Sequence, residues 1–286
     1  ILGTKNLKPI KYYEDRGSAQ CKSSIIFAGL RTEGITTIKA KKSRNHTELL
    51  CRYLKLPISF SKKKNFDLIR VKKAKKINSF NYHIPSDISS ASFFIVLTCL
   101  TENSCLTVKN VNINPSRIGI LIILKKMGVK IIFKNKRLYK GELVADIFVK
   151  SSKKLRSINC PSSLNTSSID EFLLIFLVAA KAKGVSFFKN LSELNQKESP
   201  RLKWGSKILN LMGIKNIVTD NSIKIFGNPD INIKKKIIIK NYLKDHRVFM
   251  SSAIAALAFG GEWHLHNKDS IKTSFPNFLK ILKEIQ

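Results

Sequence analysis

An internal repeat constrains the fold of this chain more than any other feature of its sequence. Two fragments at expected helix ends, Lys126-Met-Gly-Val-Lys130 and Leu211-Met-Gly-Ile-Lys215, align in register, and their methionines lie 212 − 127 = 85 positions apart. In both fragments a glycine follows an apolar helical stretch, where a left-handed backbone commonly ends a helix. Repetition at a fixed period is typical of chains built from copies of one supersecondary unit.

Each repeat is expected to contain polar residues, an apolar helix, a turn, a strand and a second helix. Strands that alternate with helices in this way predict an α/β fold. The first helices and following strands of four copies are expected at 22–30 and 35–39, 91–100 and 105–111, 172–180 and 185–188, and 248–259 and 263–266. We expect the fourth copy to lack a closing strand.

A charged stretch that starts at position 193, Glu-Leu-Asn-Gln-Lys-Glu-Ser-Pro-Arg-Leu, is a candidate ligand site. Lys197, Glu198 and Arg201 fall within five positions there. We expect Ser199 to cap a helix that has Pro200 at its first position. Two cations at a helix N-terminus suit an anionic ligand, because backbone N–H groups and the helix dipole also point there. The alternative is a solvated charged cap on an ordinary helix.

The bulk properties predict a soluble protein of one or two domains. A length of 286 residues is ample for a buried core. The longest clean apolar run, 172–180, is shorter than the roughly 20 residues that span a bilayer. No basic-then-apolar leader opens the sequence, and five cysteines without a C-x-x-C pair favour reduced thiols. We therefore expect a cytoplasmic protein that does not bind a membrane.

The formal net charge of +33 points toward a nucleic-acid partner. Lysines are spread along the whole chain, however, and arginine is scarce beside lysine. An A+T-rich genome, in which codons for lysine, isoleucine and asparagine accumulate at tolerant positions, explains this composition without such a partner. We expect the positive field to attract phosphorylated substrates rather than nucleic acid.

Several polar motifs, taken in order, resemble those of the 5-enolpyruvylshikimate-3-phosphate synthase (EPSP synthase) family. The motifs are Ser18-Ala-Gln20, Ser43-Arg-Asn-His-Thr-Glu48, Asn114-Pro-Ser-Arg117, Ser168-Ile-Asp-Glu171, the charged stretch described above and Asp245-His-Arg247. The resemblance covers nearly the whole chain. It implies a two-domain α/β enolpyruvyl transferase fold, in which repeated βαβαββ units place their helices inward and a cleft separates the domains.

The resemblance also implies the domain organisation. Residues 1–83 would belong to the domain on the shikimate 3-phosphate side, and residues 84–286 to the second domain, with a linker near 82–87. In the family the second domain is completed by the protein's own N-terminal residues. We therefore expect a segment before Ile1, no activity of the chain alone, and a monomer once it is complete.

The reaction of the family defines the candidate site residues. It transfers the enolpyruvyl group of phosphoenolpyruvate to the 5-hydroxyl of shikimate 3-phosphate and releases phosphate, on the way to chorismate and the aromatic amino acids. The matching catalytic residues are Asp170, Glu198 and Lys197. The matching contacts to shikimate 3-phosphate are Ser18, Gln20, Arg44, Asp170 and Lys197. The matching contacts to phosphoenolpyruvate are Arg201, Arg247 and, one position out of register, Lys272.

The resemblance assigns a role to each of these groups. Asp170 would orient or deprotonate the 5-hydroxyl, although it could also cap a helix. Glu198 would transfer a proton at the methylene carbon, and Lys197 would face the hydroxyl and the developing charge. The arginines would clamp the anionic substrate with their guanidinium forks. The neighbouring Glu171 is interpreted as structural, and this chemistry requires no metal or organic cofactor.

Some positions depart from the family pattern. Asn45 and Pro200 stand where aspartates are usual, which lowers the activity that we expect. Two alternatives remain at this stage. One is the sister enzyme that transfers enolpyruvyl to UDP-N-acetylglucosamine. The other is a basic, non-catalytic protein that binds nucleic acid or a protein partner.

Overall fold

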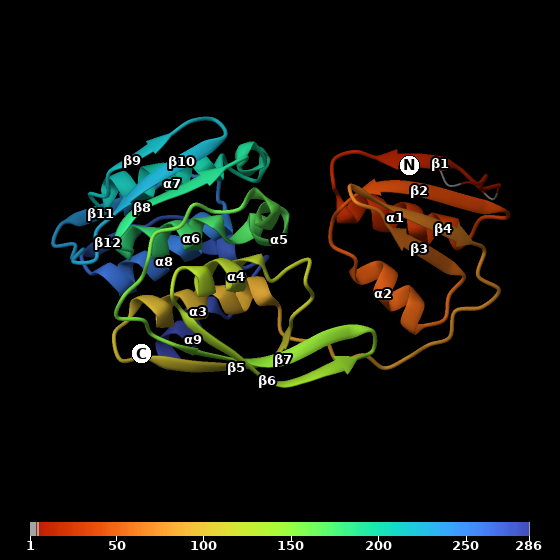
Figure 1. Cartoon of the computed structure of the whole chain (residues 1–286), viewed down its shortest axis with the longest axis horizontal. Helices are drawn as coiled ribbons and strands as arrows, with labels where there is room; N and C mark the ends of the chain where they lie inside the picture. Colours follow the sequence, from red (N-terminus) through yellow and green to blue (C-terminus); the bar gives the residue numbers. More distant parts are fainter. Residues whose placement is uncertain (1–3, 5, 286) are drawn as a thin grey trace. The chain divides into compact units, whose positions relative to one another are not determined.

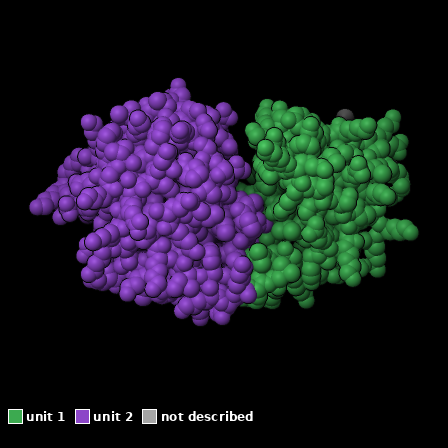
Figure 2. Space-filling view, viewed as in Figure 1, with its two compact units in different colours: residues 1–85, 137–144 green, residues 86–136, 145–286 purple. Residues whose placement is uncertain are grey.

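The computed structural model describes residue 4 and residues 6–285, which fall into two compact units (Figure 2). Unit 1 comprises residues 1–85 and 137–144, and unit 2 comprises residues 86–136 and 145–286. The short segment 137–144, which the sequence grouped with the second domain, clusters with unit 1. Each unit is described by itself below.

Unit 1 is a four-stranded sheet with two helices. Its elements are β1 (Lys11–Glu14), α1 (Ala19–Gly29), β2 (Ile35–Lys41), α2 (His46–Tyr53), β3 (Ile58–Lys62) and β4 (Phe66–Lys72). The strand order is β1-β2-β4-β3, in which β1 runs parallel to β2 and the other neighbours are antiparallel. The parallel pair needs a crossover connection, which α1 provides.

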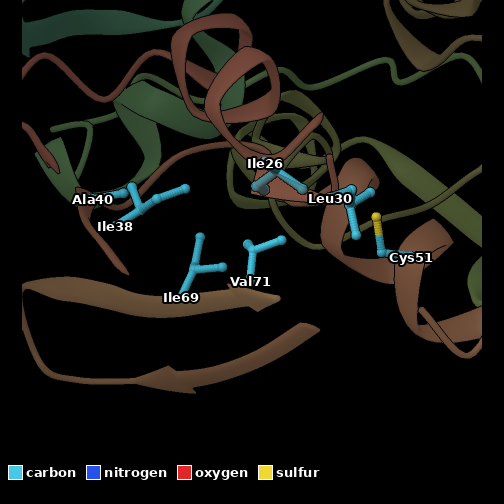
Figure 3. Packing of buried hydrophobic residues seen from close by; sticks show 7 residues of the cluster. All are labelled: Ile26, Leu30, Ile38, Ala40, Cys51, Ile69 and Val71. Atoms are coloured by element: carbon cyan, nitrogen blue, oxygen red, sulfur yellow. The ribbon is translucent and has the colours of Figure 1, made fainter. Parts of the chain in front are cut away.

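The core of unit 1 lies between α1, α2 and the sheet. It contains Ile26, Leu30, Ile38, Ala40, Cys51, Ile69 and Val71, all of them buried (Figure 3). The side chains of β2 alternate between buried and exposed, as a strand with one covered face requires. A Cβ atom at Gly29 would lie 3.1 Å from Val71 Cβ, so glycine allows α1 to approach β4 closely.

Unit 2 contains three copies of a related arrangement. The first copy comprises α3 (Ile88–Leu100), β5 (Cys105–Asn112), α4 (Gly119–Lys126), β6 (Lys130–Tyr139) and β7 (Glu142–Lys150). The second comprises η1 (Ser162–Leu164), α5 (Asn165–Ser168), η2 (Ile169–Glu171), α6 (Phe172–Lys181), β8 (Gly184–Lys189), η3 (Ser192–Gln196), α7 (Arg201–Leu211), β9 (Asn216–Val218) and β10 (Ser222–Gly227). The third comprises β11 (Lys236–Ile239), α8 (His246–Phe259), β12 (Glu262–Leu265), η4 (Lys268–Ile271) and α9 (Phe278–Glu284).

The sheets of unit 2 repeat the strand order of unit 1. The orders β5-β7-β6 and β8-β10-β9 match β2-β4-β3, and parallel bridges at Ser86, Arg156 and Asn159 stand where β1 stands in unit 1. In the third copy β11 pairs in parallel with β12. Within residues 6–285 that sheet has two strands, so the edge of β12 that faces away from β11 has no hairpin on it.

Three apolar helices form the centre of unit 2. Helices α3, α6 and α8 contact one another, and the sheets lie outside them (Figure 1). Every residue of α6 from Phe172 to Ala180 is buried, which is expected of a helix that is hydrophobic on all sides. Asp170, just before α6, and Arg247, in the first turn of α8, are two of the charged residues that the sequence singled out. The predicted α/β fold of repeated units is confirmed.

One helical segment of unit 2 is longer than the apolar run that the sequence showed. The helical segment Ser162–Lys181 is long and apolar enough to cross a membrane by length and composition, with a mean hydropathy of 1.3. The apolar run 172–180 was too short to suggest this, because η1, α5 and η2 extend the helical segment toward the N-terminus. Since 72% of its apolar 18-residue stretch is buried inside the structure, the segment has the burial of a core helix.

Candidate active site

A group of charged residues in unit 2 is centred on Arg201, the first residue of α7. Its side chain is only 3% exposed and makes two hydrogen bonds to Asp245, from Nε to Oδ2 at 2.8 Å and from Nη2 to Oδ1 at 3.2 Å. Nη1 lies 3.6 Å from Asp170 Oδ1, and Nη2 also bonds to Glu198. Arg201 therefore brings together carboxylates from three separate parts of the chain.

Asp245, which caps α8, is the main partner of Arg201. Its carboxylate is fully buried and also accepts hydrogen bonds from the Ser199 hydroxyl at 2.8 Å and from the Arg247 amide at 2.9 Å. Burial alone would raise the pKa of Asp245, but the hydrogen bonds and charge of Arg201, with the other two donors, lower it below its usual value. The carboxylate therefore stays ionised and holds the cation in place.

The structure corrects the predicted start of α7. Ser199 was expected to cap the helix, with Pro200 at its first position. Instead Pro200 occupies the capping position and α7 begins at Arg201. The Ser199 hydroxyl is used by Asp245, 46 positions away in the sequence. A buried carboxylate attracts the hydroxyl more strongly than a helix amide does, because a hydrogen bond to an ionised group is the stronger one.

Arg247 lies at the N-terminal ends of both α8 and α6. Its Nη1 donates a hydrogen bond to the carbonyl oxygen of Asp170 at 2.8 Å and lies 3.6 Å from Glu171 Oε1. Burial raises the pKa of Glu171, while the nearby charge of Arg247 and the hydrogen bond from the Ser89 hydroxyl act in the opposite direction. Asp170 and Arg247, both predicted from the sequence, are thus brought together with Arg201.

Lys197 and Glu198 lie on the more exposed side of this group. Lys197 pairs with Glu193 at 2.9 Å, and the Glu198 side chain is 54% exposed. His246 Nδ1 lies 3.8 Å from Glu198, and burial lowers the pKa of this histidine although the carboxylate opposes the shift. The ligand atoms of Glu198, Asp245 and His246 lie within 4.8 Å of one another, as a metal site would need. The Arg201 guanidinium already supplies a positive charge to both of these carboxylates.

Lys272 occupies a different environment from the other candidates. It follows η4, its side chain is 73% exposed, and it pairs with Asp269 at 2.7 Å, three positions earlier. An ion pair between two exposed side chains contributes little to stability, so this lysine is free to change partners.

Three of the five candidates for shikimate 3-phosphate binding, Ser18, Gln20 and Arg44, lie in unit 1, whereas Asp170 and Lys197 belong to unit 2. Ser18 caps α1 by accepting a hydrogen bond from the Cys21 amide at 3.2 Å, and Gln20 is exposed on the first turn of the helix. The sequence did not single out Lys22, which is completely buried. Its Nζ donates to the carbonyl oxygen of Arg44 at 2.8 Å and pairs with Glu48 at 2.7 Å.

A second contact joins the same two segments of unit 1. The hydroxyls of Ser23 and Thr47 lie 2.7 Å apart. The loop that carries Arg44 is therefore attached to the helix that carries Ser18 and Gln20. The signal that could have revealed Lys22 is a single charged residue on the otherwise apolar face of a helix, which in a folded protein demands a partner.

Comparisons with known proteins identify the family. A family model described as EPSP synthase (3-phosphoshikimate 1-carboxyvinyltransferase) matches residues 1–282. A curated 3-phosphoshikimate 1-carboxyvinyltransferase from Caldicellulosiruptor bescii is 38% identical over 283 residues, which cover 99% of this chain and 64% of that protein. The protein of the same name from Ruthia magnifica is 38% identical over 286 residues, which cover 100% of this chain and 64% of that protein.

A solved structure supports the same relationship. EPSP synthase from Acinetobacter baumannii superimposes with a TM-score of 0.89 and 35% sequence identity, covering 98% of this chain and 63% of that one. This likeness confirms the predicted enolpyruvyl transferase fold. The chain spans 64% of the length of the two curated relatives described above. Because the family model matches nearly every residue, the chain belongs to the EPSP synthase family.

Proposed function

We propose that the protein containing this chain transfers the enolpyruvyl group of phosphoenolpyruvate to the 5-hydroxyl of shikimate 3-phosphate and releases phosphate. The observation that carries the proposal is the arrangement in unit 2, where Arg201 lies between Asp170 and Glu198 in a chain of this family. An addition–elimination at the vinyl carbon needs a proton acceptor, a proton donor and fixed cations. These residues supply all three.

In the proposed mechanism, Asp170 accepts the proton of the 5-hydroxyl as its oxygen bonds to the vinyl carbon that carries the phosphate. Glu198 gives a proton to the methylene carbon, which becomes a methyl group. Glu198 then takes a proton back from the methyl group as the carbon–oxygen bond to phosphate breaks, and the phosphate leaves with the bonding electron pair, which restores the double bond in the product. Lys197 stabilises the charge that develops on the reacting oxygens.

The cations of unit 2 are suited to phosphoenolpyruvate, which carries a carboxylate and a phosphate. We assign Arg201 and Arg247 to this substrate, because a planar guanidinium group matches both kinds of anion. Both side chains are held by buried partners, so little conformational entropy remains to be lost on binding. In unit 1, we assign Ser18, Gln20 and Arg44 to shikimate 3-phosphate.

The five cysteines support a cytoplasmic location for the proposed enzyme. All five are free thiols, and three of them, Cys51, Cys99 and Cys160, are buried. Burial raises the pKa of Cys51 and Cys160 to about 11 and that of Cys99 to about 12. Thiols of this kind are unreactive and persist in a reducing compartment.

Substitution of the two carboxylates tests the proposal. In the full-length protein, Asp170→Asn and Glu198→Gln should each lower turnover by about 10²–10⁴-fold, because each removes a general acid–base group. Asp220→Asn, in which an 89% exposed aspartate is changed, is the matched control and should retain full activity. Phosphate release is measured with shikimate 3-phosphate and, separately, with UDP-N-acetylglucosamine as acceptor. Near-wild-type turnover in both site variants would contradict the assignment of Asp170 and Glu198 as the acid–base pair.

A further inference from the structure

We propose that Glu171 is a positioning residue that holds the Arg247 guanidinium and the Asp170 main chain in place for an anionic substrate. It does so at the end of a chain of hydrogen bonds, called the relay below, that also includes the buried Ser89 and the partly exposed Arg117. The inference rests on the proposed function, in which Arg247 contacts phosphoenolpyruvate, and it assigns a role to a residue that the sequence marked only as structural.

The relay joins three segments of unit 2. The Ser89 hydroxyl, at the start of α3, donates to Glu171 Oε1 at 2.5 Å. Arg117, which precedes α4, donates from Nη2 to the same hydroxyl oxygen at 2.5 Å and to Asp87 Oδ1 at 3.1 Å. Because the hydroxyl oxygen accepts from the arginine, its own proton is directed at Glu171. The carboxylate is therefore held from one side by a fixed donor.

Arg247 lies beside the same oxygen of Glu171. Its Nη1 lies 3.6 Å from Glu171 Oε1 and donates to the Asp170 carbonyl oxygen at 2.8 Å. Within the part of the chain that the structure describes, the hydrogen bonds and ion pairs of this guanidinium all use Nη1. The edge formed by Nη2 and Nε is thus the one presented to a ligand, and such an edge grips a carboxylate or phosphate with two parallel hydrogen bonds.

The side chain of Glu171 is not needed for the helix that it begins. It occupies the capping position of α6 but makes no capping hydrogen bond. The carboxyl group is 3% exposed, and burial of an acid is costly without compensation. Contacts to Ser89 and Arg247 offset part of that cost. The buried carboxyl group therefore faces an arginine and not the amides of the helix. A residue with only a structural role would not need to face a substrate-binding group.

Two variants and a matched control test the role. Glu171→Gln keeps the shape of the side chain and removes its charge, and Ser89→Ala removes the relay while leaving Glu171 in place. Ser206→Ala is the control, since this buried hydroxyl makes a hydrogen bond of 2.6 Å to Asn216 in another part of the unit. All three are made in the full-length protein, and thermal unfolding is recorded for each.

The measured quantities are the affinities for phosphoenolpyruvate, shikimate 3-phosphate and inorganic phosphate. We expect Glu171→Gln and Ser89→Ala to weaken phosphoenolpyruvate and phosphate by about tenfold, the effect of losing one hydrogen bond to a charged group. The affinity for shikimate 3-phosphate should stay within about twofold. Ser206→Ala should change none of the three affinities, even where it lowers the melting temperature.

The outcomes separate this inference from the proposed function. Phosphate binding needs no turnover, so an inactive parent that binds phosphate still tests the relay while the proposed function fails. If both relay variants bind phosphate as tightly as the parent, the inference is overturned. It is also overturned if they weaken all ligands equally, in proportion to a loss of stability such as the control shows. If Glu171→Gln does not fold, Ser89→Ala decides the question.

Discussion

Substitution of Asp245 tests the strongest claim about unit 2, that this carboxylate holds Arg201 in place. Four hydrogen bonds end on its two oxygens: Ser199 Oγ and Arg201 Nε donate to Oδ2, and Arg201 Nη2 and the Arg247 amide donate to Oδ1. In Asp245→Asn an NH2 group replaces one of these oxygens. If the NH2 group replaces Oδ1, it faces two N–H donors and two hydrogen bonds are lost. If it replaces Oδ2, the Ser199 hydroxyl can turn to accept from it, and the hydrogen bond from Arg201 Nε is lost. The charge is lost in both cases.

The structure sets the expected size of the effect. Arg201 is 3% exposed and Asp245 is fully buried, so the variant leaves a buried cation without its main counter-charge. Breaking a buried ion pair in this way costs about 3–5 kcal/mol. In a unit of the size of unit 2, each kcal/mol lowers the melting temperature by about 2–4 °C. We therefore expect Asp245→Asn to lower it by about 6–20 °C.

The measurement is thermal unfolding followed by circular dichroism, with Asp220→Asn as the control. That control is the same chemical change at a side chain that is 89% exposed and lies 3.4 Å from the exposed Lys203, and it should unfold like the parent. A second variant, Asp245→Asn with Arg201→Met, removes the unpaired charge and should recover part of the lost stability. A shift in Asp245→Asn no larger than that of the control would refute the reasoning.

Two further predictions concern pH and the edge of β12. Because burial raises the pKa of Glu171, its carboxyl should contribute stability that is fully present below its ordinary pKa and is lost as the pH rises through its folded pKa. Glu171→Gln should remove that part of the pH dependence in unfolding titrations from acid to neutral pH, and an unchanged profile would contradict the shift. Supplying the N-terminal part of the full-length protein as a separate chain should restore phosphate release and protect the amides of β12 from hydrogen exchange, because β12 pairs only with β11 in residues 6–285. Full turnover by the 286-residue chain alone would show this expectation to be wrong.

Local patterns in the sequence were sufficient to predict the repeated α/β units. Three local signals predict a helix: the period of its apolar residues, polar residues at its start and glycine at its end. All three lie within one short stretch of sequence. The fragments around Met127 and Met212 revealed the repeat for this reason. Motif order along the chain was also sufficient to predict the family, which the match to residues 1–282 shows.

The partners of the charged residues could not be predicted in this way. Asp245 and Ser199 lie 46 positions apart, and Ser89 and Glu171 lie 82 apart, yet each pair is joined by a hydrogen bond. Whether such residues meet depends on how α3, α6, α7 and α8 pack and on which turn of each helix faces the next. The sequence therefore indicated Arg201 and Arg247 as cations at helix starts, but not the carboxylates that hold them.

The same distinction explains the local errors and the overlooked residues. Serine commonly caps helices, so the sequence predicted that role for Ser199. In the structure its hydroxyl instead donates to the buried carboxylate of Asp245. Lys22 sits in a helical pattern that tolerates lysine on its surface, and only the approach of Glu48 and the Arg44 carbonyl makes a buried position possible. By itself the sequence determined the elements, their order and the family, because these depend on neighbouring residues. Only the tertiary structure decided which charges are buried together, because the free energy of a buried charge depends on groups brought close by packing.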